Sequence, residues 1–319
     1  MLVSAAPAEA ARDQSFASVA TALAANTTIA TAKGVAAALT GSPALLAETL
    51  HTVADAGNEV LLWVALRRSR RSPDATHPLG YGPERYYWAL LAAVGMFVVG
   101  GTLSVWQGVH ALIEPPPLDT FWVGVAVLVI ALVLDSVSRT VASRQLRAQA
   151  AQRGVTVRQL LRESPDPTVV TVYLEDSIDV LGAALALVAL VLHRTTGSAV
   201  PDAVATIVIG LMLGYVAVRL TGRNRQLLSN QAIPDRYMAL LRDRLSAAAG
   251  VEGVARLEAV YLGPGEVLVA ADIQMGQDLT GDDITAVLAR IRGDAARDLP
   301  VIARLYLTPV PADRSPPAG

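Results

Sequence analysis

Six apolar runs of membrane length occupy the chain between residues 17 and 221. An α-helix needs about 20 residues to cross roughly 30 Å of hydrocarbon. The runs cover residues 17–39, 44–66, 87–112, 121–142, 167–192 and 203–221, and breaks rich in proline and glycine separate them. With 53% hydrophobic and only 17% charged residues among 319, the composition lies beyond that of an ordinary soluble domain. We therefore predict an α-helical membrane protein with six transmembrane helices.

The sequence changes character at about residue 227. The segments that follow alternate as an amphipathic helix, two strands around a Gly-Pro-Gly turn, a second helix capped by Thr280 or Asp282, and a last strand. We expect a membrane domain at 17–222 and a small cytoplasmic α+β domain, in the order α-β-β-α-β, at 227–310. A domain of about 85 residues is marginal alone, so we expect it to pair with a second copy in a homodimer. Residues 1–16 and 311–319 are expected to be a loose tail and a disordered tail.

Arginine residues distinguish the two sides of the predicted membrane domain. They gather after the second, fourth and sixth runs, whereas the connections after the first and third runs contain none. Because basic residues are retained in the cytoplasm, both termini are predicted to be cytoplasmic. Heavy use of alanine and arginine with a single lysine indicates a GC-rich bacterial genome. The expected location is a bacterial cytoplasmic (inner) membrane, with an organellar inner membrane as the alternative.

Two of the apolar runs contain a stripe of acidic residues. On a helix, one face of the second run holds Glu48, His51, Asp55 and Glu59 within an arc of about 80°. The fifth run holds Glu175, Asp176 and Asp179 within about 100° of one another. Each such residue costs about 2.5–3.5 kcal/mol on membrane insertion scales. The two stripes therefore require a compensating partner.

A divalent cation is the simplest partner for these stripes. The chain has no cysteine, so a metal site must use oxygen and imidazole nitrogen. Oxygen ligands alone suit Mn²⁺ or Mg²⁺, whereas the imidazole of His51 favours Zn²⁺, Co²⁺ or Fe²⁺. Protons compete for the same groups, so we expect metal ions and protons to exchange at one place. A net charge of −2 gives no indication of nucleic-acid binding, and the lipid bilayer is the other expected partner.

Several polar residues have simpler interpretations. Asn26 in the first run is interpreted as a packing contact between helices. His110 and His193 fall at the ends of the third and fifth runs and are interpreted as surface residues.

The run SPALLAETLHTVADAGNE and the loop SPDATHPLGYGPER, together with the six runs and the tail, resemble the cation diffusion facilitators. The resemblance extends from about Ala17 to Leu307 and is strongest to the branch that contains zinc transporter 9. It implies a homodimeric exporter of Zn²⁺, or of Mn²⁺, Fe²⁺ or Co²⁺, driven by inward proton movement through alternating access. It also implies that His51 and Asp55 form the second-helix half of the transport site.

The fifth helix departs from the family pattern. With Gly182 setting the register, Asp176 matches the aspartate of the family's second ligand pair, and Val172 stands where its partner belongs. Glu175 is then the candidate for the missing oxygen, whereas a shifted register makes Glu175 and Asp179 the pair. We rank Asp176 first, Glu175 second and Asp179 third.

The loop after the second run departs as well. Asp74 and His77 match two ligands of a secondary metal site in some relatives, but Tyr81 occupies the position of the next histidine. We expect at most a weak site there and favour a structural turn. The C-terminal domain has neither histidine nor cysteine, so the resemblance implies a dimerisation element without regulatory zinc.

Two other classes of function remain open. An intramembrane metallohydrolase would need a denser ligand motif such as His-Glu-x-x-His, which the sequence lacks, so we do not expect an enzyme. A non-transporting accessory protein that retains the fold is the stronger alternative, because the ligand pair of the fifth helix is irregular.

Overall fold

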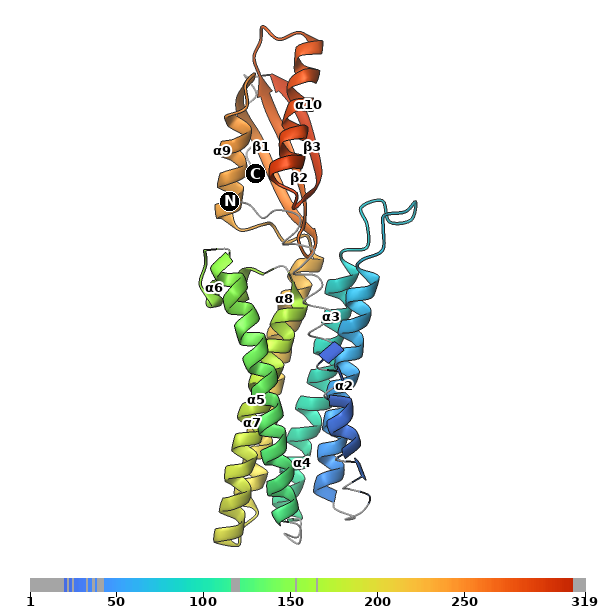
Figure 1. Cartoon of the computed structure of the whole chain (residues 1–319), viewed down its shortest axis with the longest axis vertical. Coiled ribbons are helices and arrows are strands. Elements are labelled where there is room, and N and C mark those ends of the chain that lie inside the picture. Colours follow the sequence, from blue (N-terminus) through green and yellow to red (C-terminus); the bar gives the residue numbers. More distant parts are fainter. Residues whose placement is uncertain are drawn as a thin grey trace. The chain divides into compact units, whose positions relative to one another are not determined.

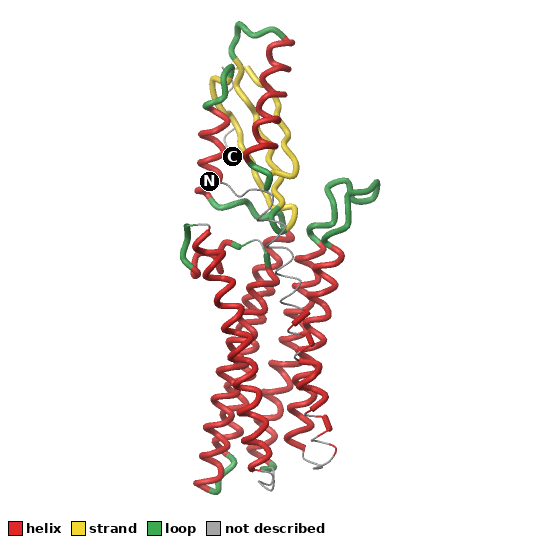
Figure 2. The backbone as a smooth tube through the Cα atoms, viewed as in Figure 1, coloured by secondary structure: helices red, strands yellow, loops and turns green. Residues whose placement is uncertain are grey.

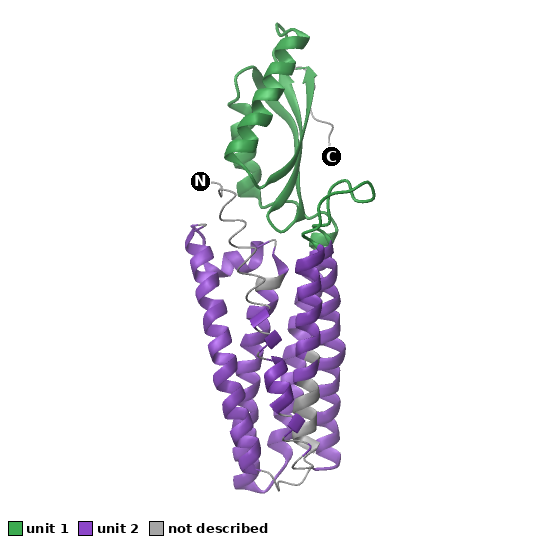
Figure 3. Cartoon of the chain, turned by 45° about the vertical axis from the view of Figure 1, so that its right-hand side comes forward, with its two compact units in different colours: residues 1–13, 69–83, 226–319 green, residues 14–68, 84–225 purple. Residues whose placement is uncertain are grey.

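The apolar runs form long helices in the computed structural model of the chain (Figure 1). The structure describes residues 20, 21, 23, 24, 26–32, 34, 35, 38, 43–115, 121–152, 154–164 and 166–311, without the side chains of 43–51, 54, 168 and 169. The predicted tail at 1–16, residues 312–319 and the side chain of His51 thus lie outside the described residues. The two compact units of the chain are distinguished in Figure 3, and each is considered by itself.

The membrane unit is a bundle of helices, as the backbone tube in Figure 2 shows. Its helices are α2 (Pro43–Arg68), α3 (Glu84–Gly95), the π-helix η1 (Met96–Thr102), α4 (Leu103–Ile113), α5 (Phe121–Gln152), α6 (Val157–Glu163), α7 (Pro167–Thr196) and α8 (Val200–Leu228). α3, η1 and α4 form one continuous helical stretch. In this bundle α5 lies beside α7, and α2 lies beside α3.

Four helical stretches in the described part of the chain are long and apolar enough to cross a membrane. They are Glu84–Ile113, Phe121–Gln152, Val170–Thr196 and Val200–Leu228. α2 is a further helix of 26 residues, and the described residues between 20 and 38 are helical. Described helical residues therefore fall within all six predicted runs, and in the described part of the chain four of the six runs meet the criterion for a span.

The helices extend beyond the apolar runs. α5 continues to Gln152 and α8 to Leu228, both through turns that carry arginine. Hydropathy marks only the part of a helix that matches hydrocarbon, whereas the backbone hydrogen bonds continue into the polar turns. The apolar runs consequently predict the existence of each helix better than its ends.

Small residues allow α8 to pack closely against η1 and α4. A Cβ atom added at Gly210 would lie 2.9 Å from the carbonyl oxygen of Gly101, and one added at Gly108 would lie 2.8 Å from that of Ala203. Such close backbone approach is typical of helix pairs in membranes. Large apolar side chains such as Trp106, Trp122 and Tyr215 are instead exposed, as expected of a surface that faces lipid.

The C-terminal unit has the predicted order α-β-β-α-β. Its elements are α9 (Asp235–Ser246), β1 (Val251–Gly263), β2 (Glu266–Met275), α10 (Gly281–Asp298) and β3 (Ile302–Pro311). β1 and β2 form an antiparallel hairpin, and β3 pairs with β2 in parallel after the crossover through α10. Every second residue of β2 is buried, because the helices cover one face of the sheet. The predicted fold class is confirmed.

The connection between α2 and α3 groups with the C-terminal unit. Residues 69–83 belong to the same compact unit as residues 226–311 (Figure 3). A Cβ atom added at Gly82 would lie 2.3 Å from the carbonyl oxygen of Leu262, at the end of β1. Arg304 of β3 donates a hydrogen bond of 3.5 Å to the carbonyl oxygen of Pro78. The loop therefore packs directly on the β1–β2 hairpin.

Candidate metal centre

The acidic stripes of the second and fifth runs lie on α2 and α7. Asn58 of α2 joins them, because its side-chain amide donates a hydrogen bond to Oε1 of Glu175 on α7. The charges that act most strongly on Glu175 are those of Asp55, Glu59 and Asp176. Asn58 therefore brings Glu175 of α7 next to α2, where the charges of the acids on α2 act on it.

Asp176 lies on the side of α7 that contacts α5. Ser138 of α5 donates a hydrogen bond of 2.8 Å to Oδ2 of Asp176, and the charges of Asp135 and Arg139, also on α5, act on the same carboxylate. Asp176 is thereby held by α5, whereas Glu175 is hydrogen-bonded to α2.

Asp179 lies one helical turn after Glu175. It is within electrostatic reach of Asp55 on α2, Asp135 on α5 and both preceding acids of α7. The charge of Asp55 therefore acts on both Glu175 and Asp179, which does not decide between the two registers. Metal binding by Asp176, Glu175 and Asp179 stays a prediction, and so does the ranking among them.

His51 is placed only through its backbone. It belongs to α2 one helical turn before Asp55, the spacing that puts both residues on one helix face. Among the residues whose side chains the structure describes, no three histidines or acids are arranged to hold a metal ion. Metal binding by His51 and Asp55 stays a prediction.

The beginning of α7 is fixed by two arginines from other helices. Arg85 of α3 forms an ion pair with Asp166, the residue before the first proline of α7. Arg223 of α8 donates hydrogen bonds to the carbonyl oxygens of Leu161 and Ser164. These contacts, together with the fixed φ of Pro167 at the first helical position, determine where the acids of α7 lie.

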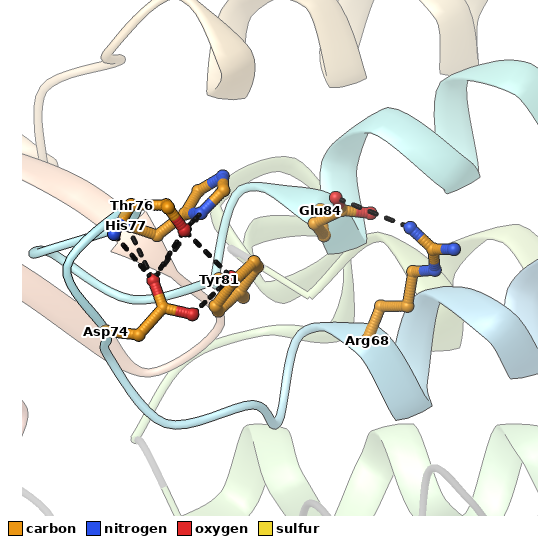
Figure 4. A network of polar contacts seen from close by, with 6 residues as sticks. All are labelled: Arg68, Asp74, Thr76, His77, Tyr81 and Glu84. Carbon is orange, nitrogen blue, oxygen red and sulfur yellow. Dashed lines mark hydrogen bonds and ion pairs between the residues drawn. The ribbon is translucent and has the colours of Figure 1, made fainter.

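The loop residues Asp74, His77 and Tyr81 form a compact hydrogen-bonded turn (Figure 4). Oδ1 of Asp74 accepts from the backbone N–H of Thr76 at 2.9 Å, from that of His77 at 2.8 Å and from the Thr76 hydroxyl at 2.7 Å. Oδ2 accepts from the Tyr81 hydroxyl at 2.6 Å. The bond from Tyr81, and then those from Thr76 and His77, hold the pKa of Asp74 well below its usual range.

His77 is also engaged within this turn. Its ring lies 4.1 Å from that of Tyr81, measured between centroids, and its Nδ1 is 2.9 Å from the Thr76 hydroxyl. Both carboxylate oxygens of Asp74 already accept hydrogen bonds, so the contacts fit a structural turn. These contacts do not test whether Asp74 and His77 bind a metal ion weakly, so the secondary site stays a prediction.

The structure corrects the interpretation of one polar residue in the membrane unit and adds contacts for two others. His193 is buried and its ring contacts the carboxylate of Asp202 on α8, so its interpretation as a surface residue is wrong. Asn58 and Ser138 were not predicted to contact the acids. Asn58 follows Asp55 by three residues, so the sequence places it on the same side of the helix as that acid. Its contact with Glu175 is seen only in the structure.

The membrane part of the chain matches a known protein family. The model of the cation efflux transmembrane domain matches residues 19–229. Metal tolerance protein C4 of Arabidopsis thaliana is 36% identical over 232 residues, which are 73% of this chain and 51% of the relative. The proton-coupled zinc antiporter SLC30A9, mitochondrial, of Homo sapiens is 30% identical over 234 residues, 73% of this chain and 41% of the relative.

A bacterial relative is similar to a comparable extent of this chain. The cation-efflux pump FieF of Escherichia coli O139:H28 is 28% identical over 231 residues, 70% of this chain and 69% of the relative. The chain spans about half the length, or less, of the plant and human relatives.

The expected location in a bacterial cytoplasmic membrane is wrong according to these comparisons. The plant metal tolerance protein and the mitochondrial antiporter show higher identity than the bacterial pump, and they point to an organellar membrane of a eukaryote. The family consists of transporters and not of enzymes. From its match over residues 19–229, the chain belongs to the cation efflux family of membrane transporters.

Proposed function

We propose that the chain is a proton-coupled exporter of a divalent metal ion, with Zn²⁺ as the favoured cargo. The transport site would lie between α2 and α7 and use His51 and Asp55 with Asp176, Glu175 and Asp179 in that order of preference. Relatives that are named proton-coupled zinc antiporters support the choice of ion and counter-ion.

The observation that carries this proposal is the meeting of acids from α2 and α7. Asp55 acts electrostatically on Glu175 and on Asp179, and α7, which carries both of these acids, is long and apolar enough to cross a membrane. Several carboxylates held this close repel one another. A divalent ion bound among them removes that repulsion, so the arrangement favours cation binding over an empty, fully ionised site.

Protons provide the means of release. A carboxylate that binds a proton no longer attracts the metal ion, and an imidazole that binds a proton loses its ligand electron pair. Binding of protons on one side of the membrane therefore displaces the ion, and loss of protons on the other side restores the site. Alternating access between the two sides converts this competition into exchange.

Flux measurements with purified protein in liposomes test the proposal. A fluorescent Zn²⁺ indicator inside the vesicles reports Zn²⁺ uptake with and without an imposed proton gradient. Uptake of Mn²⁺, Fe²⁺ and Co²⁺ is measured with indicators for those ions under the same gradients. We expect Zn²⁺ flux that requires the gradient. Asp55→Asn should abolish it, because the substitution removes a charge from the site while nearly preserving side-chain shape.

Further variants rank the residues of α7 and control for charge removal. Asp176→Asn, Glu175→Gln and Asp179→Asn each remove one carboxylate, and the largest loss identifies the main ligand. Glu114→Gln is the matched control, because Glu114 is an exposed acid beyond the end of α4, and it should leave flux unchanged. A folded protein that moves no ion would favour the non-transporting accessory protein.

Assembly as a homodimer is part of the same proposal. In the C-terminal unit, the residues of β2 that alternate with the buried ones are only half-buried, and Tyr306 on β3 is exposed. Light scattering of the detergent-solubilised protein measures the molar mass of the assembly. If the detergent-solubilised protein has the mass of one chain, and the same preparation transports Zn²⁺ after reconstitution into liposomes, the dimer is contradicted.

A further inference from the structure

Two consecutive residues of α2 carry buried oxygen atoms to which none of the described residues donates a hydrogen bond. Asn58 is 8% exposed and Glu59 is 6% exposed. Asn58 donates to Glu175 through its nitrogen, but its Oδ1 receives no hydrogen bond from the described residues. Glu59 accepts a hydrogen bond of 2.9 Å from Asn26 at Oε1, but its Oε2 receives none from that part of the chain. Buried acceptors of this kind nearly always have a partner.

Asn58 and Glu59 follow the proposed transport-site residues His51 and Asp55 along α2. Glu59 follows Asp55 by four residues, which is about 6 Å along the axis of α2 at 1.5 Å per residue. The direction is toward Arg67 and Arg68, the last residues of the helix. The charges of Asp55 and Glu59 both act on Glu175, and Asn58 donates a hydrogen bond to it, so Glu175 is a candidate for either group of residues.

Among the described residues, the charges that act most strongly near these oxygens are negative. Those that act most strongly on Glu59 belong to Asp55 and Asp176, and those on Glu175 belong to Asp55, Glu59 and Asp176. An acceptor without a donor, placed among anions, is stabilised by a cation. Carboxylate and amide oxygens are hard ligands that divalent cations accept.

We propose that Glu59, Asn58 and Glu175 form a second divalent-cation site, one helical turn from the transport site toward the arginine-bearing end of α2. This proposal rests on the proposed transport function. Two carboxylates and one amide oxygen, without imidazole, bind a metal ion more weakly than the transport site does. Weak binding suits a position where the ion pauses, because a conducting site must also release its ion.

Zn²⁺ flux as a function of Zn²⁺ concentration tests the second site. Glu59→Gln keeps an acceptor for Asn26 and removes the charge. We expect the half-saturating concentration to rise about tenfold, with flux at saturation changed by less than about twofold, which is the pattern of a lost binding contribution. Glu59→Asp should restore part of the affinity, since it returns the charge. Glu114→Gln serves again as the control.

The flux results separate the two proposals. If wild-type protein moves no ion, the proposed function fails. If wild-type protein transports and Glu59→Gln has the same half-saturating concentration, the second site is overturned and the transport function stands. If Glu59→Gln abolishes flux at every concentration, as Asp55→Asn should, Glu59 belongs to the transport site and a separate second site is overturned.

Zn²⁺ binding can be measured without flux. It is compared among variants that are shown to be folded, so a loss of binding is not caused by misfolding. Equilibrium dialysis with radioactive Zn²⁺ is applied to folded Asp55→Asn protein, in which the transport site is impaired. We expect one weakly bound ion, which the double variant Asp55→Asn/Glu59→Gln loses and Asp55→Asn/Glu114→Gln retains. Equal binding by the two double variants would overturn the proposal.

Discussion

Arg85, which is buried, and Asp166, which is partly exposed, form an ion pair between the beginnings of α3 and α7. Nη2 of Arg85 lies 2.9 Å from Oδ1 and 2.8 Å from Oδ2 of Asp166. The Arg85 side chain is 3% exposed. Because α7 carries the acids of the candidate metal centre, this pair connects their position to α3.

Removal of one partner of this pair should destabilise the membrane unit. Asp166→Ala removes a carboxylate that binds the buried guanidinium of Arg85 through both oxygens, and loss of one partner of such a contact has an expected cost of about 3–5 kcal/mol. Thermal unfolding of the detergent-solubilised protein measures the effect. Asp298→Ala is the control, because Asp298 pairs with Arg244 at 3.4 Å on the surface of the C-terminal unit, where such a pair contributes about 0–1 kcal/mol. Similar losses in both variants would contradict the role assigned to Arg85.

The Asp74 turn should depend on pH in a defined direction. The pKa of Asp74 is lowered, chiefly by the Tyr81 hydroxyl, so the carboxylate stabilises the turn fully above the ordinary aspartate pKa of about 3.9. The stabilisation is lost as the pH falls below that value through the lowered pKa. Tyr81→Phe removes the largest cause, and the loss of the turn should move to higher pH.

Hydrogen exchange of the loop amides measures this shift. The N–H groups of Thr76 and His77 donate to Asp74, so their protection, corrected for intrinsic exchange rates, reports the turn at each pH. Tyr306→Phe is the control, because it removes the hydroxyl of an exposed tyrosine in the same unit. Identical pH dependence in wild type and Tyr81→Phe would exclude the proposed cause.

The helices and the order of the C-terminal elements are predictable because each depends on local sequence. The length of an apolar run is set by the thickness of the bilayer, and the period of burial in β2 follows from strand geometry. The N-cap of α10 is Thr280, one of the two predicted residues, and Asp283 completes its capping box.

Contacts between distant residues were less predictable. Burial of His193 depends on Asp202, which α8 brings to the ring, and hydropathy places such a histidine at the surface. The hydrogen bond from Asn58 to Glu175 depends on how α2 and α7 are rotated about their axes. A helical stripe identifies the residues on one face, but it does not say which residue of the next helix each of them meets.

Zn²⁺ binding should not require the loop between α2 and α3. Both oxygens of Asp74 accept hydrogen bonds, and a metal ion would have to compete with these donors for the carboxylate. We therefore expect Asp74→Asn and His77→Ala to leave unchanged the number of Zn²⁺ ions bound per chain in equilibrium dialysis. Loss of one ion in either variant would establish a secondary site in the loop and contradict this prediction.

Gly82 should be essential for packing of the loop on the β1–β2 hairpin. A Cβ atom at this position would lie 2.3 Å from the carbonyl oxygen of Leu262 and 2.9 Å from Cα of Gly263. These are backbone atoms, so they do not move aside as the end of a flexible side chain would. Gly82→Ala should cost about 1–3 kcal/mol, as overpacking does, and should increase hydrogen exchange across residues 69–83.

Gly281→Ala is the matched control for Gly82→Ala. A Cβ atom at Gly281, the first residue of α10, would meet nothing within 4 Å, and alanine is favoured over glycine in a helix by up to about 1 kcal/mol. The control should therefore leave stability unchanged or slightly increased, with no effect on exchange in the loop. If Gly82→Ala leaves stability and loop exchange unchanged, as Gly281→Ala should, the backbone of the hairpin does not hold residues 69–83. The prediction is then wrong.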